Sequence, residues 1–424
     1  MKKFIPMFFA VSMLISACGD KTSAVAESSS SSIIEETEVK TTEAEEESKE
    51  TEEATTVPVE NDIKKTTGVL SDDLYSFQLQ VNDIVYQLPM TYEQFTGFGW
   101  IYNDDPTTEL TAGRYMSTEV FSIGKLKCYA GITNFDVNTK PVSECYITSL
   151  DFDTSRLKDA NAVITLPGGV SLGGNFDEAV ALYGTPSSDY DNETTRRSAT
   201  YSLSSNEKIE IGSVYENRDV IGSIQIRRMV KPDDFVEGTV SNGVPEIVTR
   251  YAAPTAMSDD FADFIVEYGG DLYQLPAPVS VFVANGWSIN EDASEATIDG
   301  RGGSWVTLMK DNQKLKVIAS NYDENATTIE NGFVTNIVGD TFDSKTSTVI
   351  AKNIRIGMTR AELESALNGV EYTTNEESGM FSYYKISPTG SLVDDYDISV
   401  SKETDMVTKI DVRYEPKYAV YVNR

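Results

Sequence analysis

The feature that most constrains this chain is an internal duplication. Matching segments lie 187 residues apart in the sequence: Ser71-Asp72-Asp73-Leu74 and Ser258-Asp259-Asp260-Phe261, Tyr86-Gln87-Leu88-Pro89 and Tyr273-Gln274-Leu275-Pro276, Gly99-Trp100 and Gly286-Trp287. A constant separation over about thirty residues indicates two copies of one structural unit. Core residues recur with the unit that they stabilise, so we expect Trp100 and Trp287 to be buried.

The duplication and the local composition divide the chain into five parts. We predict a signal peptide (1–17), a lipidated cysteine with a disordered acidic tether (18–66), a first repeat domain (67–230), a linker rich in Pro and Gly (231–257) and a second repeat domain (258–424). Each repeat has roughly 160 residues, which is enough for a hydrophobic core of its own.

The N-terminus predicts a secreted, lipid-anchored protein. Lys2-Lys3 precede an apolar stretch, residues 4–15, that is too short to span a bilayer as a helix. The segment Leu14-Ile15-Ser16-Ala17-Cys18 resembles the bacterial lipobox, in which cleavage occurs before a lipid-modified cysteine. We therefore expect lipid attachment at Cys18, with acyl chains such as palmitate holding the protein at the extracellular face of the cell membrane. In the alternative, an ordinary secretory signal, Cys18 is incidental.

The charge balance restricts the possible partners. The chain has 67 Asp and Glu residues against 35 Lys and Arg residues, a net charge of −32. Such a chain repels nucleic acid and anionic lipid surfaces, whereas cationic ligands, basic proteins and metal ions remain permitted. The tether has no apolar periodicity and is interpreted as a solvated spacer, with an acidic tail for a basic partner as the alternative.

The sequence contains no histidine. This absence excludes Ser-His-Asp and Cys-His catalysis, a histidine general base and histidine-ligated zinc. We expect no catalytic residues, no cofactor and no metal site.

Each copy is predicted to be an α+β domain built on antiparallel sheet. The expected order in each copy is a hairpin, a helix, three strands, a second helix and three more strands. Apolar residues at helical spacing place helices at 92–98, 176–183, 279–284 and 360–367. Asn82-Asp83 and Gly269-Gly270 suit the tight turns of the two opening hairpins.

Cys128 and Cys145 are the cysteines that remain beyond Cys18. They flank a loop at about 134–141, and because the midpoint between them falls in that loop, the two could face each other across a hairpin. A disulfide, which an extracellular location permits, and a buried apolar pair are both consistent with this placement. Neither cysteine has a neighbouring base, so no nucleophile is predicted.

Several further groups are candidate sites. Asn134-x-Asp136-x-Asn138 and Asn321-x-Asp323-x-Asn325 resemble the start of a Ca²⁺ loop, but the Gly and Glu of that loop are missing, so we interpret them as turns. Trp305 has no counterpart in the first copy. We expect it in the core, with an exposed surface for stacking a sugar or peptide as the alternative. The carboxylate pairs Asp104-Asp105, Asp151 with Asp153, and Asp394-Asp395 could serve glycoside hydrolysis, but so acidic a chain produces pairs by composition alone.

The second half of each copy carries a short motif. It consists of Leu172-Gly173-Gly174-Asn175-Phe176-Asp177-Glu178 with Tyr183-Gly184-Thr185-Pro186, and of Ile356-Gly357-Met358-Thr359-Arg360-Ala361-Glu362, each followed by strands that contain Tyr201 or Tyr383-Tyr384. This pattern resembles the module of the BamE/SmpA lipoproteins and the β-lactamase inhibitor proteins. The whole chain resembles tandem-repeat surface lipoproteins of Gram-positive bacteria. These resemblances imply protein–protein scaffolding or inhibition, without catalytic residues.

These features predict a lipid-anchored, extracellular binding or scaffold protein of the cell envelope that recognises a protein or peptide partner without catalysis. Two copies of a binding module add avidity, which favours this function. A carboxylate-based cell-wall hydrolase and an inhibitor of a secreted enzyme are the alternatives. No ligand-binding residues are assigned by the sequence.

Overall fold

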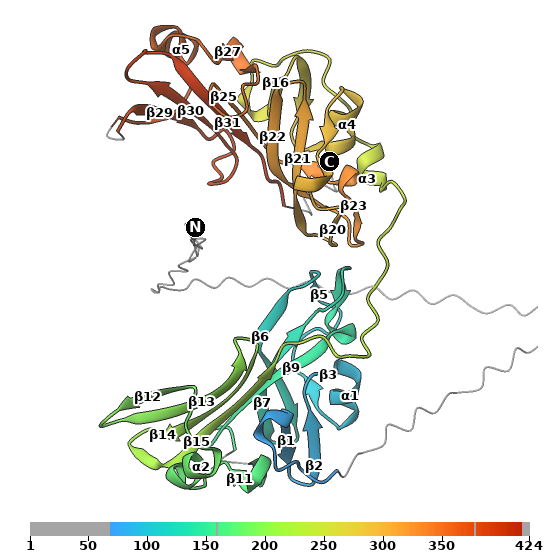
Figure 1. The fold of residues 1–424 in the computed structure, drawn as a ribbon, viewed down its shortest axis with the longest axis vertical. Coiled ribbons are helices and arrows are strands. Elements are labelled where there is room, and N and C mark those ends of the chain that lie inside the picture. Colours follow the sequence, from blue (N-terminus) through green and yellow to red (C-terminus); the bar gives the residue numbers. More distant parts are fainter. Residues whose placement is uncertain (1–67, 158–159, 377–378, 418–424) are drawn as a thin grey trace, which may run out of the picture. The chain divides into compact units, whose positions relative to one another are not determined.

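The computed structural model describes residues 68–157, 160–376 and 379–417. These residues belong to one compact unit that extends from Asp62 to Arg424. Two hydrophobic cores lie within it, one formed by residues between 74 and 226 and the other by residues between 261 and 414 (Figure 1). We keep the names first copy and second copy for residues 67–230 and 258–424. The predicted signal peptide, Cys18 and the whole of the acidic tether lie outside the described residues.

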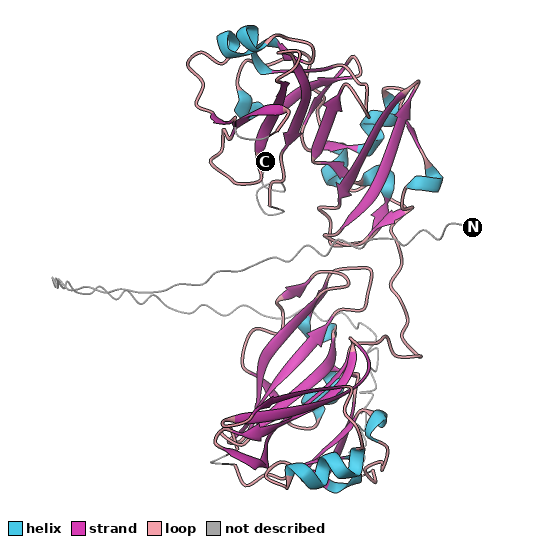
Figure 2. Ribbon diagram, turned by 60° about the vertical axis from the view of Figure 1, so that its left-hand side comes forward, coloured by secondary structure: helices cyan, strands magenta, loops and turns pink. Residues whose placement is uncertain are grey.

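The α+β prediction is wrong, because the chain is mostly β-structure (Figure 2). Among the described residues, strands account for 44% and helices for 15%. The described residues contain five α-helices, each of eight residues or fewer: α1 (Tyr92–Gly97), α2 (Phe176–Tyr183), α3 (Glu246–Thr249), α4 (Val279–Ala284) and α5 (Arg360–Ala366). The predicted helices exist, but they are too short to form a layer equal to the sheets. No helix in the described ranges is both long and apolar enough to cross a membrane.

The first copy opens with the predicted hairpin. Strands β1 (Gln78–Val81) and β2 (Ile84–Gln87) pair across the Asn82-Asp83 turn, in which Asn82 has φ 53°. Strands β10 (Ile164–Leu166) and β11 (Val170–Ser171) extend them into a four-stranded sheet in the order β11-β10-β1-β2. The small sheet supplies buried Leu79, Val81 and Leu166 to the core.

A nine-stranded sheet forms the rest of the first copy. Its order is β12-β13-β14-β15-β9-β7-β6-β4, with β3 also paired to β9. The strands are β3 (Met90–Thr91), β4 (Ile101–Tyr102), β6 (Tyr115–Ile123), β7 (Leu126–Thr133), β9 (Tyr146–Asp153), β12 (Ser188–Asn192), β13 (Arg196–Ser204), β14 (Glu207–Val214) and β15 (Asn217–Arg228). A separate two-stranded sheet joins β5 (Glu109–Leu110) to β8 (Lys140–Pro141).

The second copy repeats this plan with one break. Its small sheet has the order β17-β16-β26-β27, which corresponds to β2-β1-β10-β11. The counterpart of β9 is divided at Thr335 into β24 and β25, so the large sheet becomes two five-stranded sheets, β18-β24-β22-β21-β19 and β25-β31-β30-β29-β28. The strands are β16 (Ile265–Tyr268), β17 (Asp271–Gln274), β18 (Ala277–Pro278), β19 (Ser288–Ile289), β20 (Thr297–Ile298), β21 (Gly303–Lys310), β22 (Gln313–Ser320), β23 (Thr327–Thr328), β24 (Phe333–Val334), β25 (Asn336–Asp340), β26 (Thr348–Ile350), β27 (Ile354–Arg355), β28 (Thr373–Asn375), β29 (Phe381–Ile386), β30 (Asp395–Ser401) and β31 (Val407–Arg413).

The recurring tryptophans are core residues, as predicted. Trp100 and Trp287 are each 2% exposed. Trp100 stacks on Phe95 with ring centroids 5.2 Å apart and donates its indole N–H to the Tyr86 hydroxyl at 3.0 Å. Gly99, with φ 96°, ends α1 in a backbone conformation that favours glycine and turns the chain toward the core.

The segment 231–257, predicted as a linker, packs in part against the second copy. Ile247 and Val248 of α3 are buried in a small cluster with Tyr322 and Phe333. Apolar contacts of this kind order a chain that its Pro and Gly content alone would leave extended.

Candidate binding surface on the second copy

Cys128 and Cys145 are free and buried, so the possible disulfide is not present. The register explains why: Tyr129 pairs with Asp151 and Thr133 with Tyr146, so Cys128 on β7 lies opposite Phe152 of β9 rather than opposite Cys145. Seven residues of strand then separate the cysteines, roughly 23 Å at ~3.3 Å per residue, whereas a disulfide needs Cα atoms within about 7 Å. Burial raises the pKa of the Cys145 thiol to about 12, and that of Cys128 is also raised by burial. Both behave as buried apolar residues.

The two Asx loops are held by their own side chains. The Asn134 side-chain oxygen accepts the backbone N–H of Asp136 at 2.9 Å, and a carboxylate oxygen of Asp136 accepts the N–H of Asn138 at 2.9 Å. Equivalent hydrogen bonds of the same lengths form at Asn321, Asp323 and Asn325. These side-chain oxygens accept hydrogen bonds from the backbone and stabilise turns, which is how we interpreted the two motifs from the sequence.

The carboxylate pairs also take part in local structure. Asp151 and Asp153 both face Arg156, at 3.8 and 2.7 Å. Asp105 accepts the N–H and the hydroxyl of Thr107. Asp395 forms an ion pair with Lys385 at 2.5 Å. At all three positions the acids are used by neighbouring cations or donors.

The repeated Asp residues before the opening hairpins are helix caps. Asp73 and Asp260 each accept a backbone N–H two residues ahead and thereby cap a short 3₁₀ turn. This capping role is a structural reason for the Asp residue to recur in both copies, and it requires no bound ligand.

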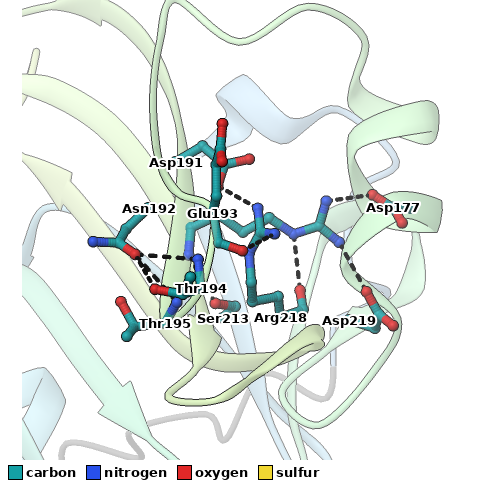
Figure 3. Close-up of polar contacts among 10 residues, drawn as sticks. Asp177, Asp191, Asn192, Glu193, Thr194, Thr195, Ser213, Arg218 and Asp219 are labelled. Carbon is teal, nitrogen blue, oxygen red and sulfur yellow. Dashed lines mark hydrogen bonds and ion pairs between the residues drawn. The ribbon is translucent and has the colours of Figure 1, made fainter.

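An arginine cluster joins α2 to the strands that follow it in the first copy. Arg197 on β13 pairs with Asp177 of α2 at 2.7 Å and with Asp219 of β15 at 3.5 Å, and its guanidinium lies 4.4 Å from the centre of the Phe176 ring. Figure 3 shows Arg218 nearby, where it donates to the Glu193 carbonyl and pairs with Asp191 at the β12–β13 turn.

The second copy builds the same junction from a different element. Gly173 N–H donates to Ile221 and Gly357 N–H to Val407, which makes Asp219 and Asp405 equivalent. Asp405 is again paired to an arginine, at 2.7 Å, but this arginine is Arg360 at the start of α5. Arg360 also donates to Ser382 and Tyr384, both at 3.0 Å. Each copy therefore ties its helix to its strands through one arginine, so the clusters are interpreted as structural.

The copies differ on the face of β6–β7 or β21–β22 that points away from the core. Trp305 pairs with Ile318 in the second copy, and at these positions the first copy has a β-bulge at Ser117-Thr118 and Gly131. The Val120–Tyr129 pair of the first copy lies on the same face of its hairpin, two pairs nearer the turn. In the first copy, Arg156 lies 3.6 Å from the centre of the Tyr129 ring and is held there by Asp153. The aromatic side chain is therefore covered by the chain itself.

The corresponding patch of the second copy is open. Trp305 is 49% and Ile318 46% exposed, so the prediction that Trp305 lies in the core is wrong. The strand alternation explains this: the buried neighbours of Trp305 and Ile318 point inward, which turns these two side chains outward. Lys314 and Lys316 share the outer face of β22, and the Lys316 ammonium lies 5.0 Å from the centre of the Trp305 ring. We call Trp305, Ile318, Lys314 and Lys316 the Trp305 patch.

Sequence reasoning found Trp305 but missed its neighbours. Ile318 could have been found, because it alternates with buried Val317 and Ala319 along β22. The contact between Arg156 and the Tyr129 ring could not have been found from the sequence, because Arg156 comes after the next strand, β9, and no local pattern links the two residues. An acid also borders the patch, because the Glu295 N–H donates to the Trp305 carbonyl at the other edge of β21.

No family model matches this chain, and neither a curated protein nor a solved structure matches it.

Proposed function

We propose that this protein is a lipid-anchored, extracellular binding or scaffold protein that recognises a protein partner through the Trp305 patch. The observation that carries the proposal is the difference between the copies on this face: the second exposes Trp305 and Ile318, whereas the first has no large apolar side chain at these positions and covers the nearby Tyr129 with Arg156. Aromatic residues at the centre of an interface supply much of its binding energy, and neighbouring charges select the partner.

The chemistry of the patch defines the partner. An apolar side chain of the partner would cover Trp305 and Ile318, and a carboxylate would approach the exposed ammonium groups of Lys314 and Lys316. The remainder of the chain is strongly acidic, so an acidic segment would be directed to this face rather than to another. The lipobox at Cys18 and the resemblance to envelope lipoproteins support an extracellular site of action.

The test uses the full-length protein as bait in envelope extracts. Trp305→Val removes the aromatic ring but keeps a β-branched residue that suits a strand, and it should reduce recovery of the specific partner at least tenfold, the loss expected for a central aromatic contact of about 1.4 kcal/mol or more. Tyr215→Ala is the matched control, because Tyr215 is an exposed aromatic residue (65%) at the β14–β15 turn. Equal recovery by wild type and Trp305→Val would reject the proposal.

A further inference from the structure

A second surface lies on the outer face of the sheet that contains β28 to β31. A cavity of about 320 Å³ opens there, and its lining is polar throughout: Thr373, Thr374, Asn375, Tyr383, Lys385, Asp397, Ser399, Lys409 and Asp411. A larger cavity of about 650 Å³ at the end of β29 also has Thr373 and Lys385 in its lining. We call the smaller cavity the polar pocket.

The side chains of the polar pocket differ from those at the equivalent positions of the first copy. Ile224 pairs with Ile211 as Ile410 pairs with Ile398, which makes Glu210 the counterpart of Asp397. At the positions of Tyr383, Lys385, Asp397, Ser399, Lys409 and Asp411 the first copy has Ser198, Thr200, Glu210, Gly212, Ser223 and Gln225. Five charged or aromatic side chains thus stand where the first copy has one.

The charges in the polar pocket are arranged in pairs, with one carboxylate left over. Lys385 is paired with Asp395 at 2.5 Å and Lys409 with Asp411 at 3.2 Å. Asp397 lies between Lys385 and Asp411 in the strand register and is partly buried. Within the described part of the chain, its carboxylate makes no hydrogen bond or ion pair, so a cationic donor from a ligand can bind it.

The remaining groups of the pocket suit hydroxyls. Ser399 is 6% exposed, lines the cavity beside Asp397, and its hydroxyl makes no hydrogen bond among the described residues. Lysine ammonium groups donate and carboxylates accept, and a sugar hydroxyl does both. The Tyr383 ring gives the one aromatic surface in this lining.

A protein partner fits this pocket poorly. The centre of a protein interface is enriched in aromatic residues and depleted in Lys and Asp, whereas the polar pocket has two lysines, two aspartates and no aliphatic side chain in its lining. We propose that the polar pocket binds a saccharide that carries a free amine, with the amine on Asp397, hydroxyls on Ser399 and the Lys–Asp pairs, and a sugar ring on Tyr383. This site and its ligand are independent of the Trp305 patch.

The experiment titrates the full-length protein with a glucosamine trimer by calorimetry, beside the N-acetylglucosamine trimer, whose amines are capped. We expect the free-amine trimer to bind at least about tenfold more tightly, the size of one charge-assisted hydrogen bond. Asp397→Asn should abolish that preference, and Tyr383→Ser, which introduces the first-copy residue, should weaken both trimers. Glu210→Gln, the matched change in the first copy, should leave binding unchanged.

Three results would overturn the proposal. The first is equal affinity for the two trimers, and the second is an unchanged preference in Asp397→Asn. The third is binding of an oligolysine peptide of equal charge as tightly as the sugar, which would assign the pocket to a protein. Circular dichroism of each variant confirms that it folds. If the saccharide proposal fails, the proposed role of Trp305 is unaffected, because it is tested by a separate experiment.

Discussion

At the scale of single residues, equivalent positions in the two copies have acquired different surroundings. Trp305 and Ile318 stand where the first copy has a β-bulge at Ser117-Thr118 and Gly131. Arg156 covers the Tyr129 ring of the first copy at 3.6 Å, whereas Lys316 lies 5.0 Å from the Trp305 ring and leaves Trp305 about half exposed. The comparison separates residues that the fold needs in both copies from residues that only one copy uses.

The buried cysteines give a prediction of this kind. Cys128→Ser should lower the free energy of unfolding by about 1–3 kcal/mol, because a buried hydroxyl loses its water. Cys128→Val, which introduces an apolar residue of similar size, should change it by less than about 1.5 kcal/mol. Urea unfolding measures both. A thiol reagent should modify Cys128 and Cys145 only after unfolding, and an oxidised pair in the native protein would contradict the structure.

A second prediction at the scale of single residues concerns the titration of Asp397. Burial raises the pKa of this carboxyl, Asp395 and Asp411 raise it further, and Lys385 and Arg413 oppose them. A pKa above that of the unfolded chain means that the ionised carboxylate destabilises the fold at higher pH, and that this cost disappears as pH falls below the unfolded value near 4. Asp397→Asn should therefore raise the melting temperature at pH 7 and have less effect at pH 4. A larger increase in melting temperature at pH 4 than at pH 7 would show that the pKa of Asp397 is not raised in the folded protein.

At the scale of elements, regular patterns were predictable and polar strands were not. Helices α2 and α4 begin and end where the apolar periodicity places them, and both opening hairpins form at their predicted turns. Strand β12, Ser188–Asn192, is exposed along its whole length and has no apolar alternation to reveal it. Missing β10, β12, β26 and β28 made the helices seem equal partners of the sheets.

The candidate sites follow the same division. Trp305 was recognisable because it breaks the repeat, but the polar pocket was not, since its residues come from four strands whose register is set only when the sheet forms. The cysteine pair was misplaced for the same reason, because a loop with its own short helical turn shifts the centre of the hairpin away from the midpoint.

The arginine junctions predict local stability. Arg360→Met removes hydrogen bonds to Asp405, Ser382 and Tyr384 and should increase hydrogen exchange of the α5 amides roughly tenfold, in line with ~1 kcal/mol for a partly exposed network. Arg355→Met, just before the helix, is the control and should leave α5 unchanged. Equal protection in both variants would show that packing alone holds the helix.

At the scale of the whole molecule, one unit has been duplicated and then specialised. Both copies keep the hairpin, the capped turn and the buried tryptophan, which are features of the scaffold. The Trp305 patch and the polar pocket both belong to the second copy. We infer that the second copy carries recognition.

Anchoring itself is tested at Cys18, which lies outside the described residues. Cys18→Ser should move the protein from the membrane fraction to the medium, because a serine at this position cannot carry the acyl chains that hold the protein at the membrane. Labelled palmitate should be incorporated by wild type only. Retention of Cys18→Ser in the membrane fraction would contradict the lipoprotein prediction.

The central claim, recognition by the open face of the second copy, is tested most directly in cells. A photo-cross-linking amino acid is placed at Ile318 of the full-length protein and, in a matched strain, at Tyr129 on the same face of the first-copy hairpin. We predict a discrete cross-linked protein from position 318 that Trp305→Val abolishes, and none from position 129. The same product from both positions, or none from position 318, would contradict the account.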